Sequence, residues 1–198
     1  MYRPAGNTQG RPEVPRATRV CHDASVSPLP LIHEPDEMTA AWLTAALRSA
    51  YPDGHITTFS SSPVGTGLMA RSYRLRLEGE GDLPASIVAK VPSDEDATRQ
   101  LGARAYRREV GFYQDLADEV SGRVPACHHA DISESGTEFV LLLEDITPAD
   151  QGDQLTGCSI DGANRAIGNL ARLHASTWGR DDEFAWLETG SGSAHDLV

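Results

Sequence analysis

The chain has 198 residues, with 17 Lys and Arg residues against 29 Asp and Glu residues, so its formal net charge is −12. Binding to nucleic acids or acidic lipids depends on basic side chains that displace counterions from phosphates, and an acidic chain provides few of them. We therefore expect neither a nucleic-acid partner nor a membrane partner. The apolar content of 39%, together with 18 glycines, is typical of a globular domain.

Cysteine usage and the N-terminal sequence both bear on the cellular compartment. The three cysteines, Cys21, Cys127 and Cys158, are odd in number and scattered, which does not suggest a disulfide framework. No apolar run is as long as a membrane span, and residues 1–19 lack the apolar core of a signal peptide. We expect a cytoplasmic protein.

Prolines and apolar periodicity divide the first half of the chain. Residues 1–35 hold six prolines without a periodic pattern, which predicts a disordered tail. Residues 36–50 predict an amphipathic helix that begins at acidic residues and ends before a Pro-Asp-Gly stop. Alternating apolar residues then predict antiparallel strands on either side of a turn at residues 65–67, and a further strand over 85–91.

Longer periodic segments follow in the second half. Residues 97–120 predict a helix, residues 139–143 a buried strand, residues 163–178 a second long helix, and residues 190–198 a flexible end. The resulting order of helix, strands, helix, strand and helix predicts an α+β fold rather than a regular βαβ alternation.

The glycine turn Gly65-Thr66-Gly67 has three interpretations. With Ala70 it fits a G-x-G-x-x-A dinucleotide motif, but that motif needs a following helix, and residues 73–77 alternate like a strand. A plain hairpin turn also favours glycine. A glycine turn between two strands can instead cover the phosphates of a nucleotide, because its backbone N–H groups approach them closely. The residues alone leave the last two open.

Lys90 ends an apolar strand, and Glu109 falls within the apolar arc of the next predicted helix. At 100° per residue from Leu101, Glu109 lies at about 80°, among apolar residues. These are Ala105, Phe112, Tyr113, Leu116 and Val120. A carboxylate on a buried face needs a cation, and Lys90 is the nearest upstream candidate. Alternatively, Lys90 faces solvent and Glu109 pairs locally with Arg104, Arg107 or Arg108.

A glycine turn, a strand ending in Val-Ala-Lys and a helix with an inward Glu follow the order of a kinase N-terminal lobe. The sequence resembles the aminoglycoside phosphotransferase superfamily, most of all its ecdysteroid-kinase-like branch, which is related to the choline kinases. The resemblance covers roughly residues 36–187. It is carried by the ordered segments PVGTGLMARSYRLRL, ASIVAKVPS, AYRREVGFYQDLA, RVPACHHAD, FVLLLEDI, AIGNLARLHASTW and FAWL.

The resemblance implies a protein-kinase-like N-lobe over residues 36–146, an antiparallel sheet with one helix, and a partial helical C-lobe over 147–189. It implies that Gly65 and Gly67 cover the phosphates of ATP, that Lys90 binds them and that Glu109 orients Lys90. A hinge backbone would meet the adenine at Leu143, Glu144, Asp145 and Ile146. Complete members use ATP with Mg²⁺ and transfer the γ-phosphoryl group to a hydroxyl of a small molecule.

Catalysis in this family uses a His-x-Asp loop, a later Asn and a further Asp, which are expected after the 163–178 helix. Only His195-Asp196 matches there, and we interpret it as part of a flexible end. The sequence therefore predicts an incomplete, inactive member, truncated or frameshifted, with no catalytic or metal-binding residues. The alternatives are a non-catalytic nucleotide-binding module and an unstable fragment. Apolar faces of the 139–143 strand and the last helix would then be exposed and favour self-association.

Three further groups suggest other chemistry. Cys127-His128-His129 could hold zinc, but adjacent residues converge poorly on one tetrahedral ion, so a loop after Pro125 is the preferred interpretation. His174 is predicted to be a packed helix histidine rather than a base. Glu144 and Asp145 point in different directions, which indicates the end of a strand rather than a glycosidase carboxylate pair.

Overall fold

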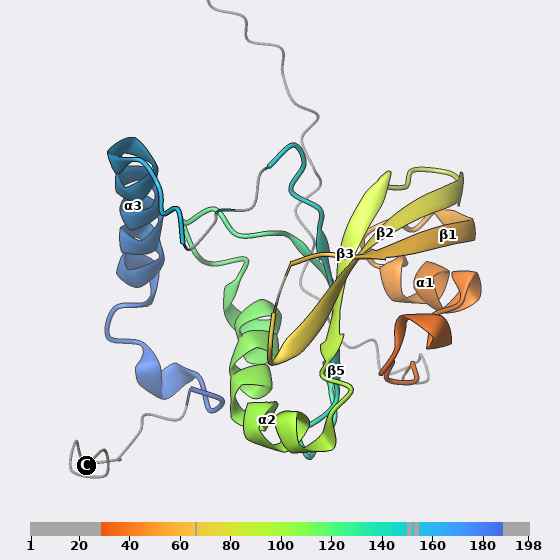
Figure 1. Ribbon diagram of the computed structural model, residues 1–198, viewed down its shortest axis with the longest axis horizontal. Helices are drawn as coiled ribbons and strands as arrows, with labels where there is room; N and C mark the ends of the chain where they lie inside the picture. The colour runs from red at the N-terminus through yellow and green to blue at the C-terminus, as the bar shows by residue number, and fades with distance from the viewer. Residues whose placement is uncertain (1–28, 66, 150–151, 153–154, 188–198) are drawn as a thin grey trace, which may run out of the picture.

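The computed structural model describes residues 29–65, 67–149, 152 and 155–187. Within them, five strands form one antiparallel sheet in the order β1-β2-β3-β5-β4, accompanied by three α-helices (Figure 1). The strands are β1 (His55–Pro63), β2 (Ala70–Glu80), β3 (Ser86–Pro92), β4 (Cys127–Ile132) and β5 (Phe139–Glu144). The helices are α1 (Ala40–Leu47), α2 (Asp96–Gly111) and α3 (Ile160–Thr177). The α+β class predicted from the sequence is confirmed.

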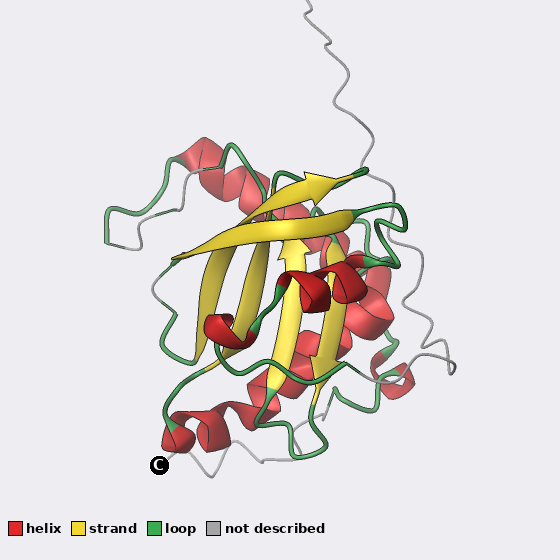
Figure 2. Cartoon of the chain, turned by 90° about the vertical axis from the view of Figure 1, so that its right-hand side faces the viewer, coloured by secondary structure: helices red, strands yellow, loops and turns green. Residues whose placement is uncertain are grey.

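The sheet is buried on both faces, because successive side chains of a strand point to opposite sides. On β5, Val140 and Leu142 belong to the core cluster that contains α1. Phe139, Leu141 and Leu143 belong to a second cluster, which contains α2. Figure 2 shows helices in front of and behind the strands. The uninterrupted apolar run of β5 is thus explained by burial on both sides.

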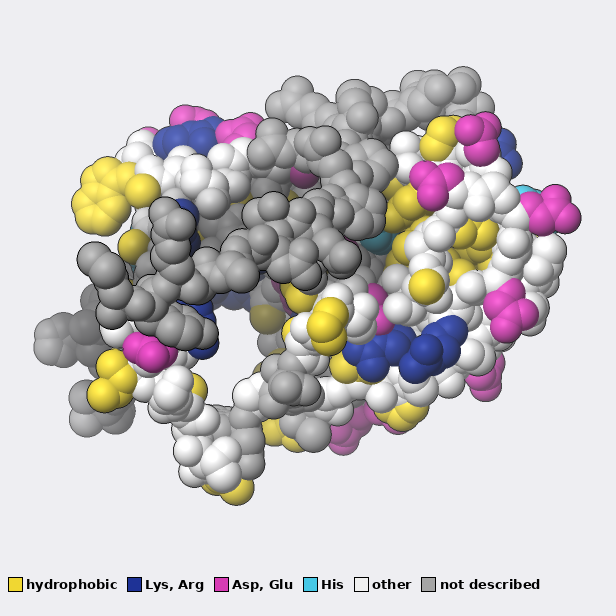
Figure 3. Space-filling model, turned by 90° about the horizontal axis from the view of Figure 1, so that it is seen from above, with side chains coloured by type: hydrophobic (Ala, Val, Ile, Leu, Met, Phe, Trp, Pro, Cys, Tyr) yellow, Lys and Arg dark blue, Asp and Glu magenta, His cyan; other side chains and the backbone are white. Residues whose placement is uncertain are grey.

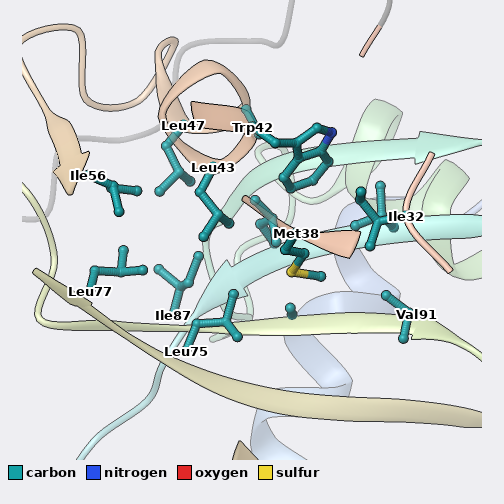
Figure 4. Packing of buried hydrophobic residues seen from close by; sticks show 14 of the residues in the cluster. Ile32, Met38, Trp42, Leu43, Leu47, Ile56, Leu75, Leu77, Ile87 and Val91 are labelled. Atoms are coloured by element: carbon teal, nitrogen blue, oxygen red, sulfur yellow. The ribbon is translucent and has the colours of Figure 1, made fainter. Parts of the chain in front are cut away.

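Helix α1 closes one face of the sheet. Its N-terminus is capped by Thr39, whose side chain accepts a hydrogen bond from the backbone N–H of Trp42. Leu43 and Leu47 on the buried side of the helix are at most 1% exposed. Figure 4 shows them facing Ile56 and other apolar residues of the strands. The predicted helical start at residues 36–37 is instead a short 3-10 helix, η1 (Pro35–Glu37).

Residues 29–35 also pack against this core. Ile32 is 3% exposed, and the indole N–H of Trp42 donates to the carbonyl of Pro30 over 2.9 Å. The prediction that the tail extends to residue 35 is therefore wrong for residues 29–35, because Ile32 gains enough burial to order the prolines around it. Residues 1–28 lie outside the described residues.

Helix α2 covers the other face, but with a different stripe from the one predicted. Its buried residues are Gly102, Tyr106, Val110 and Gly111, whereas Leu101 is 80% exposed. The helix continues as a π-helical segment, η2 (Phe112–Leu116), in which Ala117 N–H donates to the carbonyl of Phe112. A π-helical turn contains an extra residue and rotates the later residues relative to the earlier helix. Apolar residues on either side of residue 111 therefore do not share the single predicted arc.

The segment Cys127-His128-His129 begins strand β4, so the interpretation as a loop after Pro125 is wrong. His128 is 4% exposed, and its ring lies 5.3 Å from the ring of Tyr51. The ring of His129 meets Trp42 edge-on at 5.6 Å. Both imidazoles pack as rings between the sheet and the α1 segment. Because histidine is a polar residue type, the sequence of β4 does not show the apolar–polar alternation that marks other strands.

Helix α3 is longer than predicted at its N-terminus and begins after Ser159, whose side chain accepts a hydrogen bond from the N–H of Gly162. The structure describes every residue of α3, and none of these residues is buried. Ile160, Ile167 and Leu170 are 81%, 63% and 49% exposed. Figure 3 shows hydrophobic side chains protruding on the side where α3 lies in Figure 1. The last helix is exposed, as predicted. Strand β5 is buried, so the predicted exposure of an apolar face on the 139–143 strand is wrong.

The predicted flexible end at residues 190–198, including His195-Asp196, lies outside the described residues. No helix among the described residues has the length and apolar character needed to cross a membrane.

Candidate functional site

Strand β3 presents Lys90 to helix α2. Ile87, Ala89 and Val91 point into the core beneath α1, so the alternation of the strand directs Lys90 to the opposite face. There its ammonium group donates to both carboxylate oxygens of Glu109, over 2.6 and 2.7 Å. The side chains are 26% and 32% exposed, respectively. The predicted pairing of Lys90 with Glu109 is present.

Glu109 lies at the edge of the buried stripe of α2 rather than inside it. Its chain neighbour Val110 is fully buried, and Tyr106 is 2% exposed. The carboxylate consequently keeps contact with solvent while it holds Lys90. Burial, reinforced by the charge of Glu109, raises the pKa of Tyr113 on the next turn. An ammonium group fixed by one carboxylate and still open to solvent can accept a second anionic partner.

The glycine turn joins β1 to β2 and adopts conformations that favour glycine. Gly65 has φ of 78°, in the left-handed region. A Cβ added to Gly67 would lie 2.8 Å from the carbonyl oxygen of Ala70, which is closer than side chains come to backbone. Thr66 lies outside the described residues. The turn thus needs both glycines for its backbone path, as a hairpin turn and a phosphate-covering turn both do.

A contact that the sequence did not predict ties this turn to α2. The hydroxyl of Tyr106, three residues before Glu109, donates to the carbonyl of Met69, the residue just before β2. The Tyr106 ring packs on Phe139 at 4.6 Å, and Gly102 leaves the space that it occupies. The pair Gly102 and Tyr106, one turn apart, is the only signal that could have indicated this packing. It fixes the glycine turn relative to the helix that carries Glu109.

The predicted hinge residues lie at the end of β5, beside the start of β3. In the register of these strands Glu144 is opposite Ile87, and Lys90 is opposite Leu141. Leu143 is 8% exposed and packs in the cluster beneath α2, so it shares a face of the sheet with Lys90. The C-terminal end of β5 and the lysine of β3 therefore border the same side of the sheet.

The carboxylates of Glu144 and Asp145 are each engaged in an ion pair. Glu144 accepts hydrogen bonds from Arg123, which hold its pKa below the usual range. Asp145, with a side chain only 3% exposed, accepts hydrogen bonds from Arg74 and Ser86 that likewise lower its pKa. Both carboxylates stay ionised and pair with guanidinium groups, Glu144 with Arg123 and Asp145 with Arg74. This is in keeping with the end of a strand rather than with an acid-base pair. Ile146 is 36% exposed.

The other candidate groups form no catalytic cluster in the described part of the chain. Burial raises the pKa of the Cys127 thiol to about 12, which leaves it protonated. Burial lowers the pKa of His128 and keeps it neutral. Among the described residues, no three His, Cys, Asp or Glu side chains are placed to hold a metal ion. His174 is exposed on α3, so its prediction as a packed helix histidine is wrong.

No protein-family model matches this chain, and no significant match is found among curated proteins. The resemblance to aminoglycoside phosphotransferases therefore stays an expectation drawn from the sequence motifs.

Proposed function

We propose that residues 29–146 form the nucleotide-binding lobe of an ATP-dependent phosphotransferase that phosphorylates a hydroxyl group of a small molecule. The observation that carries this proposal is the double hydrogen bond from Lys90 on β3 to Glu109 on the following helix. Kinases use a strand lysine held by a helix glutamate to bind the α- and β-phosphates of ATP. The sheet and the helix supply the corresponding elements in the same chain order.

The residue type at this position supports the proposal further. Lys90 is the only lysine of the chain, whose other basic side chains are all Arg or His. A lysine presents a compact point charge on a flexible stem, whereas the arginine fork is suited to planar, bidentate partners. A chain that uses arginine for Arg74–Asp145 and Arg123–Glu144 has its one ammonium group where the phosphates would lie.

The described residues fit the phosphates of a nucleotide. Gly65 and Gly67 carry no side chains that would shield the backbone N–H groups of the turn from a ligand. Lys90 supplies a cation that remains partly open to solvent. Mg²⁺ bound with ATP would neutralise phosphate charge, but the described residues hold no suitable group of three ligands, and we assign no metal-binding residue.

The proposal assigns only ATP binding to the described residues, so the test measures binding rather than turnover. Isothermal titration with ATP is performed on the 198-residue chain, on Lys90→Met and on Arg48→Met. Arg48 is exposed at the end of α1, on the far face of the sheet, and its substitution removes the same charge. We expect Arg48→Met to bind like the wild type and Lys90→Met to bind at least tenfold more weakly. Equal binding by all three, or none by the wild type, would refute the proposal.

A further inference from the structure

A cavity of about 480 Å³ lies between helix α2 with its π-helical extension and the C-terminal part of α3 with the segment that follows it. Its volume lies within the range of small-molecule pockets, roughly 300–1,000 Å³. Most of its lining is apolar or aromatic. The main wall residues are Phe112, Leu116, Leu173, Trp178, Phe184 and Trp186. We call this space the aromatic cavity.

The walls of the aromatic cavity are held in place by specific contacts within the chain. The indole N–H of Trp186 donates to Asp115 over 2.6 Å, and a Cβ on Gly111 would overlap the indole ring. Arg180 joins Glu119 over 2.8 Å and Glu183 over 2.7 Å. These contacts attach the segment after α3 to the end of α2. A preformed pocket binds with less loss of conformational entropy.

The charges around the cavity favour an uncharged occupant. Its lining includes the guanidinium groups of Arg108 and Arg180 and the imidazole of His174. Three carboxylates, those of Asp115, Glu119 and Glu183, bind wall residues Trp186 and Arg180 and offset these cations. The guanidinium of Arg180, at the edge of the cavity, already has two carboxylate partners and stacks over the ring of Phe184 at 5.4 Å. An anionic ligand would compete with Glu119 and Glu183 for this cation. A neutral ring would leave both ion pairs intact and gain the aromatic contacts.

Trp178 provides a second indication. Its side chain belongs to the cavity wall, yet it is 85% exposed. A large aromatic surface left in water at the mouth of an apolar cavity is typical of a ligand-binding site. The limited volume favours a single small molecule over a docked helix, because a helix with its side chains is about 10 Å across.

We propose that the aromatic cavity is a binding site for an uncharged aromatic small molecule. The site is independent of nucleotide binding at Lys90, so failure of one proposal does not affect the other. The probe is 2-naphthol, with naphthalene-2-sulfonate as its charged analogue. Both are titrated into the ¹⁵N-labelled 198-residue chain.

The readout is the indole N–H signals of the three tryptophans. Trp178 and Trp186 line the cavity, whereas Trp42 lies in the α1 core and serves as an internal control. We expect 2-naphthol to shift the signals of Trp178 and Trp186 in a saturable way and to leave Trp42 unchanged. The sulfonate should bind at least tenfold more weakly, and tighter binding of the sulfonate would overturn the assignment of an uncharged ligand.

Two matched variants on α3 separate specific from non-specific binding. Thr177→Phe fills the cavity from its wall, and Ala175→Phe adds the same ring to an exposed position outside it. We expect Thr177→Phe to abolish the response and Ala175→Phe to retain it, with the Trp42 signal of both unchanged. No response of the wild type, an equal shift of Trp42, or an equal response of both variants would overturn the proposal. Trp178 and Trp186 signals that change with protein concentration without probe would assign the cavity to a second copy and overturn it as well.

Discussion

Lys90 on β3 and Glu109 on α2 are joined by two hydrogen bonds of 2.6 and 2.7 Å, although 18 residues separate them in the chain. The contact depends on the alternation of β3, which buries Ala89 and Val91 beneath α1 and turns Lys90 toward α2. The pairing is therefore a consequence of the sheet being covered on both sides. It fixes the position of the one ammonium group that the sequence provides outside the N-terminus.

The first prediction concerns the orientation of Lys90. Glu109→Gln keeps the size of the side chain but removes the charge that holds the ammonium group, so we expect ATP affinity to fall about tenfold, or ~1.4 kcal/mol. Glu78→Gln, at an exposed position of β2, is the matched control and should bind like the wild type. Titration calorimetry on the two variants measures the difference. An unchanged affinity in Glu109→Gln would show that Glu109 does not position Lys90 for the nucleotide.

The second prediction concerns the link between the glycine turn and α2. Tyr106→Phe removes the hydroxyl that donates to Met69 while the ring keeps its contact with Phe139. We expect the free energy of unfolding to fall by about 0.5–1.5 kcal/mol. We also expect faster solvent exchange of the Val64 amide N–H, which donates to the carbonyl of Ser72 across the turn. Denaturant unfolding and hydrogen exchange measure the two effects. Unaltered exchange at Val64 would mean that the hydrogen bond of Tyr106 does not hold the turn.

The sequence predicted the positions of helices and strands better than it predicted which of their faces are buried. The strands around the glycine turn and the run at residues 139–143 were predicted because their apolar residues follow simple patterns. Strand β4 was missed because His128 and His129 pack as aromatic rings against Tyr51 and Trp42, which the residue types do not reveal. The stripe of α2 was misplaced because a π-helical segment at Phe112–Leu116 changes the phase.

Within the candidate site, the pair that a local sequence pattern indicates was predicted, whereas contacts that depend on packing between distant segments were not. Lys90 and Glu109 were predictable, because a charge on an apolar element requires a partner. The contacts of Tyr106 with Met69 and of Trp186 with Gly111 join segments 37 and 75 residues apart, and no local periodicity encodes such pairs. The packing of Ile32 was missed for the same reason, since one apolar residue among prolines has no period.

The third prediction concerns acid stability. The hydrogen bond from Arg74 holds the pKa of Asp145 below its usual range, so the folded state favours the ionised carboxyl. This contribution is complete above the ordinary carboxyl pKa of about 4 and is lost as pH falls through the lowered pKa. Asp145→Asn should lower the free energy of unfolding at pH 7 by roughly 1–3 kcal/mol and by less at pH 3. Urea unfolding at both pH values tests this.

The control for acid stability is Asp82→Asn, an exposed carboxylate at the β2–β3 turn. It should leave both the stability at pH 7 and its decline with acid unchanged. Equal loss of stability at the two pH values in Asp145→Asn would contradict a role for the ionised carboxyl.

The fourth prediction concerns the junction of α2 with the segment after α3. Gly111→Ala places a methyl group into the indole of Trp186, so we expect unfolding free energy to fall by roughly 1–3 kcal/mol and the Trp186 indole signal to shift. Gly168→Ala, where the added Cβ meets no atom within 4 Å, should instead stabilise helix α3 by up to about 1 kcal/mol. Stabilisation by both substitutions would show that Trp186 does not pack on Gly111.

Amine-specific labelling provides the most direct measurement of nucleotide binding at Lys90. Because Lys90 is the only lysine, an amine-reactive reagent can modify two sites, the N-terminal amine and Lys90, and peptide mass spectrometry distinguishes them. We predict that ATP protects Lys90 at concentrations that saturate binding and leaves modification of the N-terminal amine unchanged. Labelling of Lys90 that proceeds equally fast with and without ATP would contradict nucleotide binding at this site.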